Sequence, residues 1–368
     1  MEFIDLKVQQ ARIKSDLDRR IAAVLAHGQY IMGPEVLELE GRLSAYTGAK
    51  HCITVASGTD ALLISLLALG VGPGDEIITT PFSFVATAEV IVLLGAKPIF
   101  IDVEADTCNI DARLIEAALT PRTKAIMPVS LYGQPPEMDA INAIAAGHGG
   151  VPVIEDAAQS FGATYKGRRS CNISTIGCTS FFPSKPLGCY GDGGAIFTSD
   201  DALAQRCREI RIHGQQQRYR HTRVGVAGRM DTLQCAIVLA KLERFDWEVE
   251  QRHAIGQRYD QLADQAPIAH VQQRPERSGV FAQYTVFAPD RARLQAACRR
   301  ADIPTAVHYP MPINEQPAYQ HLSSPGCTPV AHELAKVVLG LPMGPDLSAA
   351  DQARVGDVLR AYARGPTA

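Results

Sequence analysis

The sequence lacks any run of about 18 apolar residues, the length that a helix needs to span a bilayer. Its first residues include acids and no apolar segment of the kind found in signal peptides, so a cytoplasmic protein is expected. The nine cysteines form no Cys-x-x-Cys pair and no regular framework. Zinc clusters and disulfide scaffolds are therefore not indicated, and we expect reduced thiols and no metal.

An excess of one charge is also missing. The chain has 36 Lys and Arg against 39 Asp and Glu, with the two signs interspersed. No basic surface for nucleic acid or an anionic membrane is expected, so any anionic ligand must be bound by local donors. The length of 368 residues exceeds what one small core needs. We expect two domains, residues 1–240 with an N-terminal helical segment and residues 241–368.

Short apolar segments alternate with helical segments after residue 50. This order predicts a mostly parallel α/β sheet of seven strands with helices on both faces. Strands are expected at residues 52–55, 76–80, 98–103, 125–129, 151–155, 178–182 and 195–198, with helices at 59–69, 83–94 and 137–146. Ligands of such sheets bind outside the carboxyl ends of the strands, so the residues that follow each strand are candidates for a site.

Helical spacing of apolar residues predicts two helices before the sheet, the second opened by Gly33-Pro34. One long helix over residues 230–264 is expected to connect the two domains. A strand at 283–288 and helices at 291–300 and 331–339 then predict a small α+β domain at the end of the chain.

Lys185 lies between Pro183 and Pro186 in a turn that follows an apolar strand. A lysine held rigidly at the ligand edge of a sheet can form a Schiff base with a carbonyl, because desolvation lowers the pKa of its amine. A lysine in a turn is, however, usually a solvated surface residue. The residues at the neighbouring strand ends must therefore decide between the two interpretations.

Asp156 ends an apolar strand and is followed by two alanines. A carboxylate buried there needs a cationic partner, and a protonated pyridine nitrogen would serve and would make the ring an electron sink. Gln159 lies about one helical turn further on, where it could reach the phenolic oxygen of such a ring. The alternative for Asp156 is a helix cap at the end of the strand.

The segment Ser57-Gly58-Thr59 follows a strand and opens a helix, whose free N–H groups and dipole favour a phosphate. Ser180, just before the lysine turn, could add a hydroxyl group. Phe84 follows another strand end and could stack on a ring, although a core aromatic is the simpler interpretation. Tyr190, after the lysine turn, is a candidate substrate contact.

In this order the motifs resemble the nucleotide-sugar aminotransferases, a branch of the aspartate-aminotransferase fold (fold type I). The resemblance covers nearly the whole chain and rests on Ser57-Gly58-Thr59, Phe84, Glu155-Asp156-Ala157-Ala158-Gln159 and Ser180-Phe181-Phe182-Pro183-Ser184-Lys185. It implies pyridoxal 5'-phosphate (PLP) as cofactor and a homodimer with active sites at the subunit interface. Glutamate would be the amino donor and a nucleotide-linked keto sugar the acceptor.

The same resemblance implies individual roles. Lys185 would form the Schiff base, Asp156 would pair with the pyridine nitrogen, and Gln159 would contact the phenolic oxygen. The remaining cofactor contacts would be Gly58, Thr59 and Ser180 at the phosphate and Phe84 against the ring. One position departs from the family, because Ala227 stands where an asparagine commonly reaches the phosphate in the partner subunit.

Within the family the sequence is most similar to enzymes that aminate the C3 keto group of a UDP-linked 2-acetamido-2-deoxy-3-oxo-hexuronic acid, for bacterial surface polysaccharides such as O-antigen. We expect Arg229, with His308 and Tyr309, to bind the sugar carboxylate, since the planar guanidinium matches that group. The alternatives for Arg229 are a cap at the start of the long helix at Met230 or an ion pair with Asp231.

Other functions stay open at this point. The acceptor could be a neutral 3- or 4-keto-deoxysugar nucleotide, or the protein could bind PLP as a regulator without turnover. Against regulation stand the retained Lys185 and the lack of an appended DNA-binding domain. Dehydratases of the same fold are a nearer alternative, but they resemble this chain less at position 185, where they have histidine.

Overall fold

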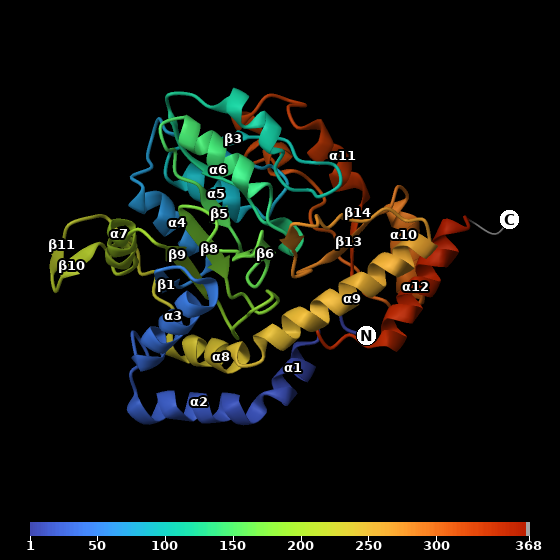
Figure 1. Ribbon diagram of the computed structural model, residues 1–368, viewed down its shortest axis with the longest axis horizontal. Helices are drawn as coiled ribbons and strands as arrows, with labels where there is room; N and C mark the ends of the chain where they lie inside the picture. The colour runs from blue at the N-terminus through green and yellow to red at the C-terminus, as the bar shows by residue number, and fades with distance from the viewer. Residues whose placement is uncertain (366–368) are drawn as a thin grey trace.

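The computed structural model describes residues 1–365 and is built around one mixed sheet (Figure 1). Its strands follow the spatial order β1-β9-β8-β5-β4-β2-β3. Their bounds are His51–Val55 (β1), Glu76–Thr79 (β2), Lys97–Phe100 (β3), Thr123–Met127 (β4), Ile154–Asp156 (β5), Ile176–Ser180 (β8) and Gly194–Thr198 (β9). Strand β9 is antiparallel to both neighbours, and the other neighbouring pairs are parallel. The predicted α/β fold with a mostly parallel sheet is confirmed.

Helices cover both faces of the sheet. On one face lie α4 (Gly58–Ala68), α5 (Ala86–Leu93) and α7 (Asp201–Arg211), and on the other α3 (Pro34–Thr47), α6 (Met138–Gly147) and α8 (Thr232–Leu242). Consecutive strand residues serve opposite layers, since Ile196 packs with the first set of helices and Phe197 with the second. The sheet is thus buried on both sides, as its apolar strands predict.

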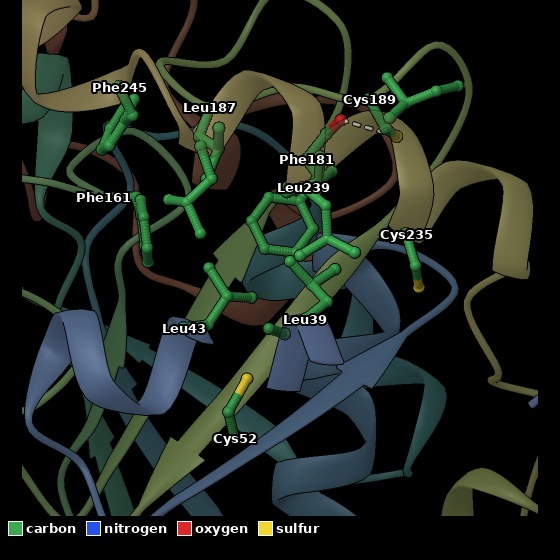
Figure 2. Close-up of a cluster of buried hydrophobic side chains, with 14 of the residues drawn as sticks. Leu39, Leu43, Cys52, Phe161, Phe181, Leu187, Cys189, Cys235, Leu239 and Phe245 are labelled. Carbon is green, nitrogen blue, oxygen red and sulfur yellow. Dashed lines mark hydrogen bonds between the residues drawn. The ribbon is translucent and has the colours of Figure 1, made fainter. Parts of the chain in front are cut away.

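The long helix expected over residues 230–264 is two helices. Helix α8 ends at Leu242, and α9 (Phe245–Gln265) begins after a break at residues 243–244. The break lets Phe245 enter the large core (Figure 2), while the later residues of α9 leave toward the C-terminal part of the chain (Figure 1). Burial of one aromatic ring therefore outweighs helical continuity.

The helix expected at 331–339 begins and ends two residues earlier than predicted. Helix α11 (Pro329–Val337) gives way to strand β14 (Val338–Leu341), which pairs antiparallel with β13 (Tyr284–Phe287). The apolar residues 338–341 fit either a helix or a strand, and pairing with a segment more than 50 positions away decides for the strand. Helix α10 (Arg291–Arg300) lies where the sequence predicted it.

The C-terminal residues build a core of their own. It joins the second half of α9, β13, β14, α10 and α12 (Ala349–Ala363), and includes Tyr259, Tyr284 and Leu339. Helix α12 and the large-domain helix α7 were not predicted from the sequence. The remaining elements are α1 (Leu6–Arg12), α2 (Lys14–His27), β6 (Thr164–Tyr165), β7 (Arg168–Arg169), β10 (Gln215–Gln217), β11 (Arg220–His221), β12 (Arg277–Ser278) and short 3-10 helices η1 (Ala112–Leu114), η2 (Glu116–Ala118), η3 (Leu131–Gly133), η4 (Ile313–Glu315) and η5 (Gln320–Leu322).

The helices and the cysteines can be compared with what the sequence predicted about membrane segments and disulfides. In residues 1–365 we find no helix with both the length and the apolar content that crossing a membrane requires. All nine cysteines are free thiols, and each is buried except Cys327. Burial raises the pKa of the Cys189 thiol to about 11, so this cysteine near the lysine turn is protonated at neutral pH and is not a reactive thiolate.

Candidate active site

The turn that carries Lys185 is anchored in the large core on both sides. Phe181, Leu187 and Cys189 are buried there with residues of α3 and α8 (Figure 2). The Cys189 N–H donates to the Phe181 carbonyl at 2.7 Å, and the Lys185 N–H donates to the Phe182 carbonyl at 2.9 Å. The backbone of the turn is thus fixed, and the lysine side chain leaves it at the ligand edge of the sheet.

Asp156 and Lys185 lie close enough to influence each other's ionisation. Burial raises the pKa of Asp156, and the charge of Lys185 partly offsets this effect. Burial lowers the pKa of Lys185, and Asp156 opposes that shift. The carboxylate accepts hydrogen bonds from Thr87 Oγ1 at 3.0 Å and from the Ala158 N–H at 3.2 Å. It is therefore a buried acid with room for a further cationic partner, beside an amine that deprotonates easily.

The start of α4 forms a cradle against the end of β8. Ser57 caps the helix by accepting the Asp60 N–H at 3.0 Å, which leaves the N–H groups of Gly58 and Thr59 at the open helix terminus. A Cβ atom on Gly58 would lie 2.6 Å from the Cβ atom of Ser180, so only glycine allows this approach. The arrangement brings helix N–H groups and the Ser180 hydroxyl together, as an anion such as phosphate requires.

Gln159, His308 and Tyr309 close the site from the other side. The Gln159 Nε2 group donates to the Tyr309 hydroxyl at 3.3 Å. His308 is half-buried, and burial together with the charge of Lys185 lowers the pKa of its imidazole. Phe84 is 55% exposed, and its ring centroid lies 6.5 Å from that of Tyr309. Phe84 is thus not a core aromatic, and its ring face is available for stacking.

Arg229 and Tyr190, the two remaining candidate substrate contacts, differ in their surroundings. Arg229 is half-buried, and within residues 1–365 it forms no ion pair within 4.0 Å, so the alternative pairing with Asp231 is absent. The Tyr190 N–H donates to Gln234 Oε1 at 2.9 Å, and the Lys241 Nζ atom lies 4.4 Å from the centre of the Tyr190 ring. Tyr190 packs on the large core, and its role as a substrate contact stays a prediction.

Sequence reasoning missed two residues of the site. Thr87 lies near the start of α5, three positions after Phe84, and its hydroxyl is bonded to Asp156; its place one helical turn from a predicted site residue was a usable signal. Tyr132 contacts Gln159 through its N–H group and the His308 carbonyl through its hydroxyl. No local pattern in the sequence indicated Tyr132.

The chemistry of these groups fits PLP. A primary amine faces a buried carboxylate, an amide donor lies nearby, and an anion cradle opens at the same edge of the sheet. The carboxylate lacks a full counter-charge in the protein, which a protonated pyridine nitrogen would supply. The assignment of each residue to the cofactor stays a prediction.

The chain is similar to known aminotransferases over nearly its whole length. A model of the DegT/DnrJ/EryC1/StrS aminotransferase family matches residues 11–360. The UDP-2-acetamido-2-deoxy-3-oxo-D-glucuronate aminotransferase of Pseudomonas aeruginosa is 58% identical over 350 residues, which cover 95% of this chain and 97% of the relative.

Solved structures agree with the family match. DesV of S. venezuelae is 38% identical, with a TM-score of 0.97 and coverage of 100% of this chain and 99% of that chain. NtdA from Bacillus subtilis with bound cofactor PMP is 30% identical, with a TM-score of 0.90 and coverage of 98% and 83%. The chain therefore belongs to the DegT/DnrJ/EryC1/StrS aminotransferase family and is a PLP-dependent transaminase.

Proposed function

We propose that the enzyme moves an amino group from glutamate to the C3 keto group of a UDP-linked 2-acetamido-2-deoxy-3-oxo-hexuronic acid. The observation that carries this proposal is the 58% identity, over 95% of the chain, to a Pseudomonas aeruginosa aminotransferase named for such a uronate. The Arg229 guanidinium, which has no carboxylate within 4.0 Å in residues 1–365, supports it, because a sugar carboxylate is the group that such a side chain binds best.

We assign the central chemistry to Lys185 and Asp156. When bound, PLP supplies a carbonyl that bonds to amines and a protonated ring that spreads the charge of a carbanion. Lys185 Nζ would be the amine that holds PLP through this carbonyl, since burial favours its neutral, nucleophilic form. As a free amine, Nζ would accept a proton from the substrate and return it. Asp156 would keep a proton on the ring nitrogen, and Thr87 and Ala158 hold its carboxylate in place.

The other side chains orient the reactants. The backbone N–H groups of Gly58 and Thr59, with the Ser180 hydroxyl, would bind the phosphate, and Phe84 would lie against the ring. Gln159 presents its amide nitrogen toward the site and so would donate to the phenolic oxygen. His308 is neutral at pH 7 because burial and Lys185 lower its pKa. A neutral imidazole can donate one hydrogen bond to a carboxylate without drawing a charge into the protein.

We further propose a cytoplasmic homodimer that serves surface polysaccharide synthesis, with the two domains at residues 1–240 and 241–368. Large apolar side chains are exposed in the link between α2 and α3 and in segments near site residues, as expected for a surface covered by a second subunit. They are Tyr30 (49% exposed), Ile31 (50%), Phe84 (55%), Phe182 (51%) and Met311 (41%). Light scattering of the purified protein should give twice the mass of one chain.

Ala227 bears on this assembly. It is exposed next to the β10–β11 hairpin, and alanine cannot donate the side-chain hydrogen bond that an asparagine gives at this position in the family. A water molecule can substitute for such a donor. Ala227→Asn should accordingly tighten PLP binding. The dissociation constant of PLP is measured by equilibrium dialysis at a series of decreasing cofactor concentrations. A weaker affinity in the variant would show that the position faces another group.

The substrate is tested with a panel of keto-sugar nucleotides and glutamate. We expect the highest kcat/KM for the UDP-linked 3-keto-uronic acid. Arg229→Met should lower that value by about 10- to 100-fold, the effect of one charged hydrogen bond, and should leave a neutral 3-keto-hexose nucleotide almost unchanged. Arg168→Met, which removes an exposed arginine paired with Asp139, is the matched control.

Each alternative has its own result. Equal losses on both substrates would give Arg229 a structural or cofactor role. A wild-type preference for the neutral sugar would replace the uronate with a neutral keto sugar as acceptor. A cofactor spectrum that glutamate does not change would instead favour a PLP-binding regulator.

A further inference from the structure

Tyr132, which has no proposed contact with the cofactor, lies at the centre of a chain of hydrogen bonds that includes Gln159 and His308. It is buried in η3 and adopts a left-handed backbone conformation with φ of 56°. Its N–H group donates to Gln159 Oε1 at 2.7 Å, and its hydroxyl donates to the His308 carbonyl. One residue thus touches two different parts of the candidate site, which are about 150 positions apart in the sequence.

The bond from the Tyr132 N–H fixes which way the Gln159 amide faces. An amide offers one acceptor oxygen and two donor hydrogens. Because Oε1 accepts from Tyr132, Nε2 must point the other way, where it donates to the Tyr309 hydroxyl at 3.3 Å. The second hydrogen of Nε2 is left for a ligand. A reversed amide would place two donors against each other at Tyr132.

The Tyr132 hydroxyl holds the segment that brings Tyr309 to the site. This segment leaves the C-terminal core at Ala306, which bridges to Gly340 of β14. It reaches the large domain again where the Ile313 N–H donates to the Pro81 carbonyl at 2.8 Å. His308 and Tyr309 lie between these two fixed points. The bond from Tyr132 to the His308 carbonyl ties the middle of the segment to the large domain.

The backbone of Tyr132 is itself fixed independently of its hydroxyl. The Leu131 N–H donates to Asn109 Oδ1 at 3.0 Å, and the Tyr132 carbonyl accepts the Ala282 N–H at 3.0 Å. Gly133 has φ of 100°, and a Cβ atom there would lie 2.9 Å from the Ala282 nitrogen. Removal of the hydroxyl alone should therefore leave the bond to Gln159 in place.

We propose that Tyr132 is a positioning residue for transamination: its N–H group orients the Gln159 amide, and its hydroxyl holds in place the segment that carries His308 and Tyr309. This inference rests on the proposed cofactor roles of Gln159 and Lys185. Reacting groups must be held within fractions of an ångström. Loss of one of these hydrogen bonds should therefore reduce the rate of transamination without removing any group that reacts.

The test uses Tyr132→Phe in the holoenzyme with Tyr259→Phe as the matched control. Tyr259 is equally buried, and its hydroxyl donates to the Pro342 carbonyl at 2.9 Å in the C-terminal core. Both variants lose one buried hydroxyl-to-carbonyl bond, so both should unfold at a lower temperature. Only Tyr132→Phe should shift the pH midpoint of the visible absorbance of cofactor bonded to Lys185, and only it should lower kcat, by about tenfold.

Deuterium uptake by residues 306–311, measured on the same samples, needs no substrate. We expect faster uptake in Tyr132→Phe and wild-type uptake in Tyr259→Phe. Unchanged uptake would overturn the proposal whatever the substrate proves to be. Faster deuterium uptake with an unchanged pH midpoint and an unchanged kcat would show that Tyr132 has only a structural role. This result would also overturn the proposal.

Tyr309→Phe examines the same chain from its far end and does not depend on the folding of the first variant. It should shift the pH midpoint in the same direction, and the double variant should show less than the sum of the two shifts, because both substitutions break one network. Additive shifts would mean that Tyr132 and Tyr309 act separately, which contradicts the proposal. Absence of a Lys185-dependent band in the wild-type protein would count against the proposed function instead.

Discussion

Two adjacent carboxylates on β5, Glu155 and Asp156, have opposite surroundings. Glu155 is fully buried on one side of the strand, where it accepts hydrogen bonds from Ser130 Oγ at 2.8 Å, from Ser170 Oγ at 2.6 Å and from the Cys171 N–H at 2.8 Å. Asp156, on the other side, accepts one hydroxyl and one N–H group at 3.0 and 3.2 Å. Burial raises the pKa of both acids.

The difference shows that burial alone does not mark a catalytic acid. The donors around Glu155 come from two segments, one at Ser130 and one at Ser170 and Cys171, so this carboxylate joins parts of the fold and has little left to offer a ligand. Asp156 has fewer and longer bonds, and Lys185 is close enough to lower its pKa. A buried acid that the protein leaves incompletely satisfied is the one poised to bind a cation.

The largest effect is expected from Lys185→Ala. If Lys185 is the amine that bonds to the cofactor near Asp156, the variant should lose all measurable amination. It should also lose the visible absorbance of cofactor bonded to lysine. Lys166→Ala, which removes an exposed lysine paired with Asp139, should keep both. Turnover or a borohydride-stable cofactor adduct in Lys185→Ala would show that another lysine does the work.

Asp156→Asn should be the next most severe change. An amide cannot keep the ring nitrogen protonated, so amination should fall by about two to three orders of magnitude. The free energy of unfolding of the apoprotein should change little, because the substitution also removes a poorly compensated buried charge. Activity assays and urea unfolding on the same preparation check both parts. Near-normal turnover would leave Asp156 as no more than a helix cap.

Glu155→Gln should show the reverse pattern. Its three donors lose a charged acceptor, which should lower the free energy of unfolding by about 1–3 kcal/mol, while kcat should stay within about threefold of wild type. Urea unfolding and steady-state rates give the comparison. A rate loss as large as that of Asp156→Asn would mean that the two sides of β5 are coupled and that Glu155 is not a purely structural acid.

The sequence predicted the catalytic edge of the fold because parallel strands carry their carboxyl ends to the same place. Asp156 ends β5, Gly58 follows β1, and Ser180 ends β8 just before the Lys185 turn. Strand ends can be found from apolar segments alone, so these residues were predicted to meet without knowledge of the pairing. Their proposed roles came from the resemblance and not from the spacing.

Features that depend on distant pairing were not predicted. Tyr132 joins His308 across 176 positions, and its left-handed backbone is imposed by neighbours such as Ala282 rather than by its own residue type. Strand β14 forms because β13 is there to pair with it. Neither contact leaves a periodic signal in the sequence.

A second buried lysine, Lys241, differs from Lys185 in its surroundings, and its substitution should change the protein least. Lys241 on α8 is 2% exposed and lies over the Tyr190 ring, in the core that also holds Cys171 beside Glu155. Burial lowers its pKa to about 8, although Glu248 and Cys189 act in the other direction. Unlike Lys185, it has no proposed role in the reaction, so its charge is expected to cost stability.

The sign of the pH effect follows from the two pKa values. The folded pKa of about 8 lies below the ordinary value of about 10.4, so between these pH values the unfolded chain binds a proton that the folded protein does not. The contribution of Lys241 to stability should therefore rise as pH increases from 8 to 10.4, and its full cost should be present below pH 8. Two pKa units correspond to about 3 kcal/mol, which the Tyr190 ring partly offsets.

Lys241→Met should accordingly raise the free energy of unfolding at pH 7 by about 1–2 kcal/mol. Because cysteines and tyrosines also titrate in this range, the informative quantity is the difference between wild type and variant, which should shrink toward zero as pH rises from 8 to 10. Lys14→Met removes an exposed lysine paired with Asp18 and should give no such trend. If Lys241→Met instead destabilises the protein by the same amount at every pH, the Lys241 charge is fully compensated, as the Glu155 charge is by its three donors.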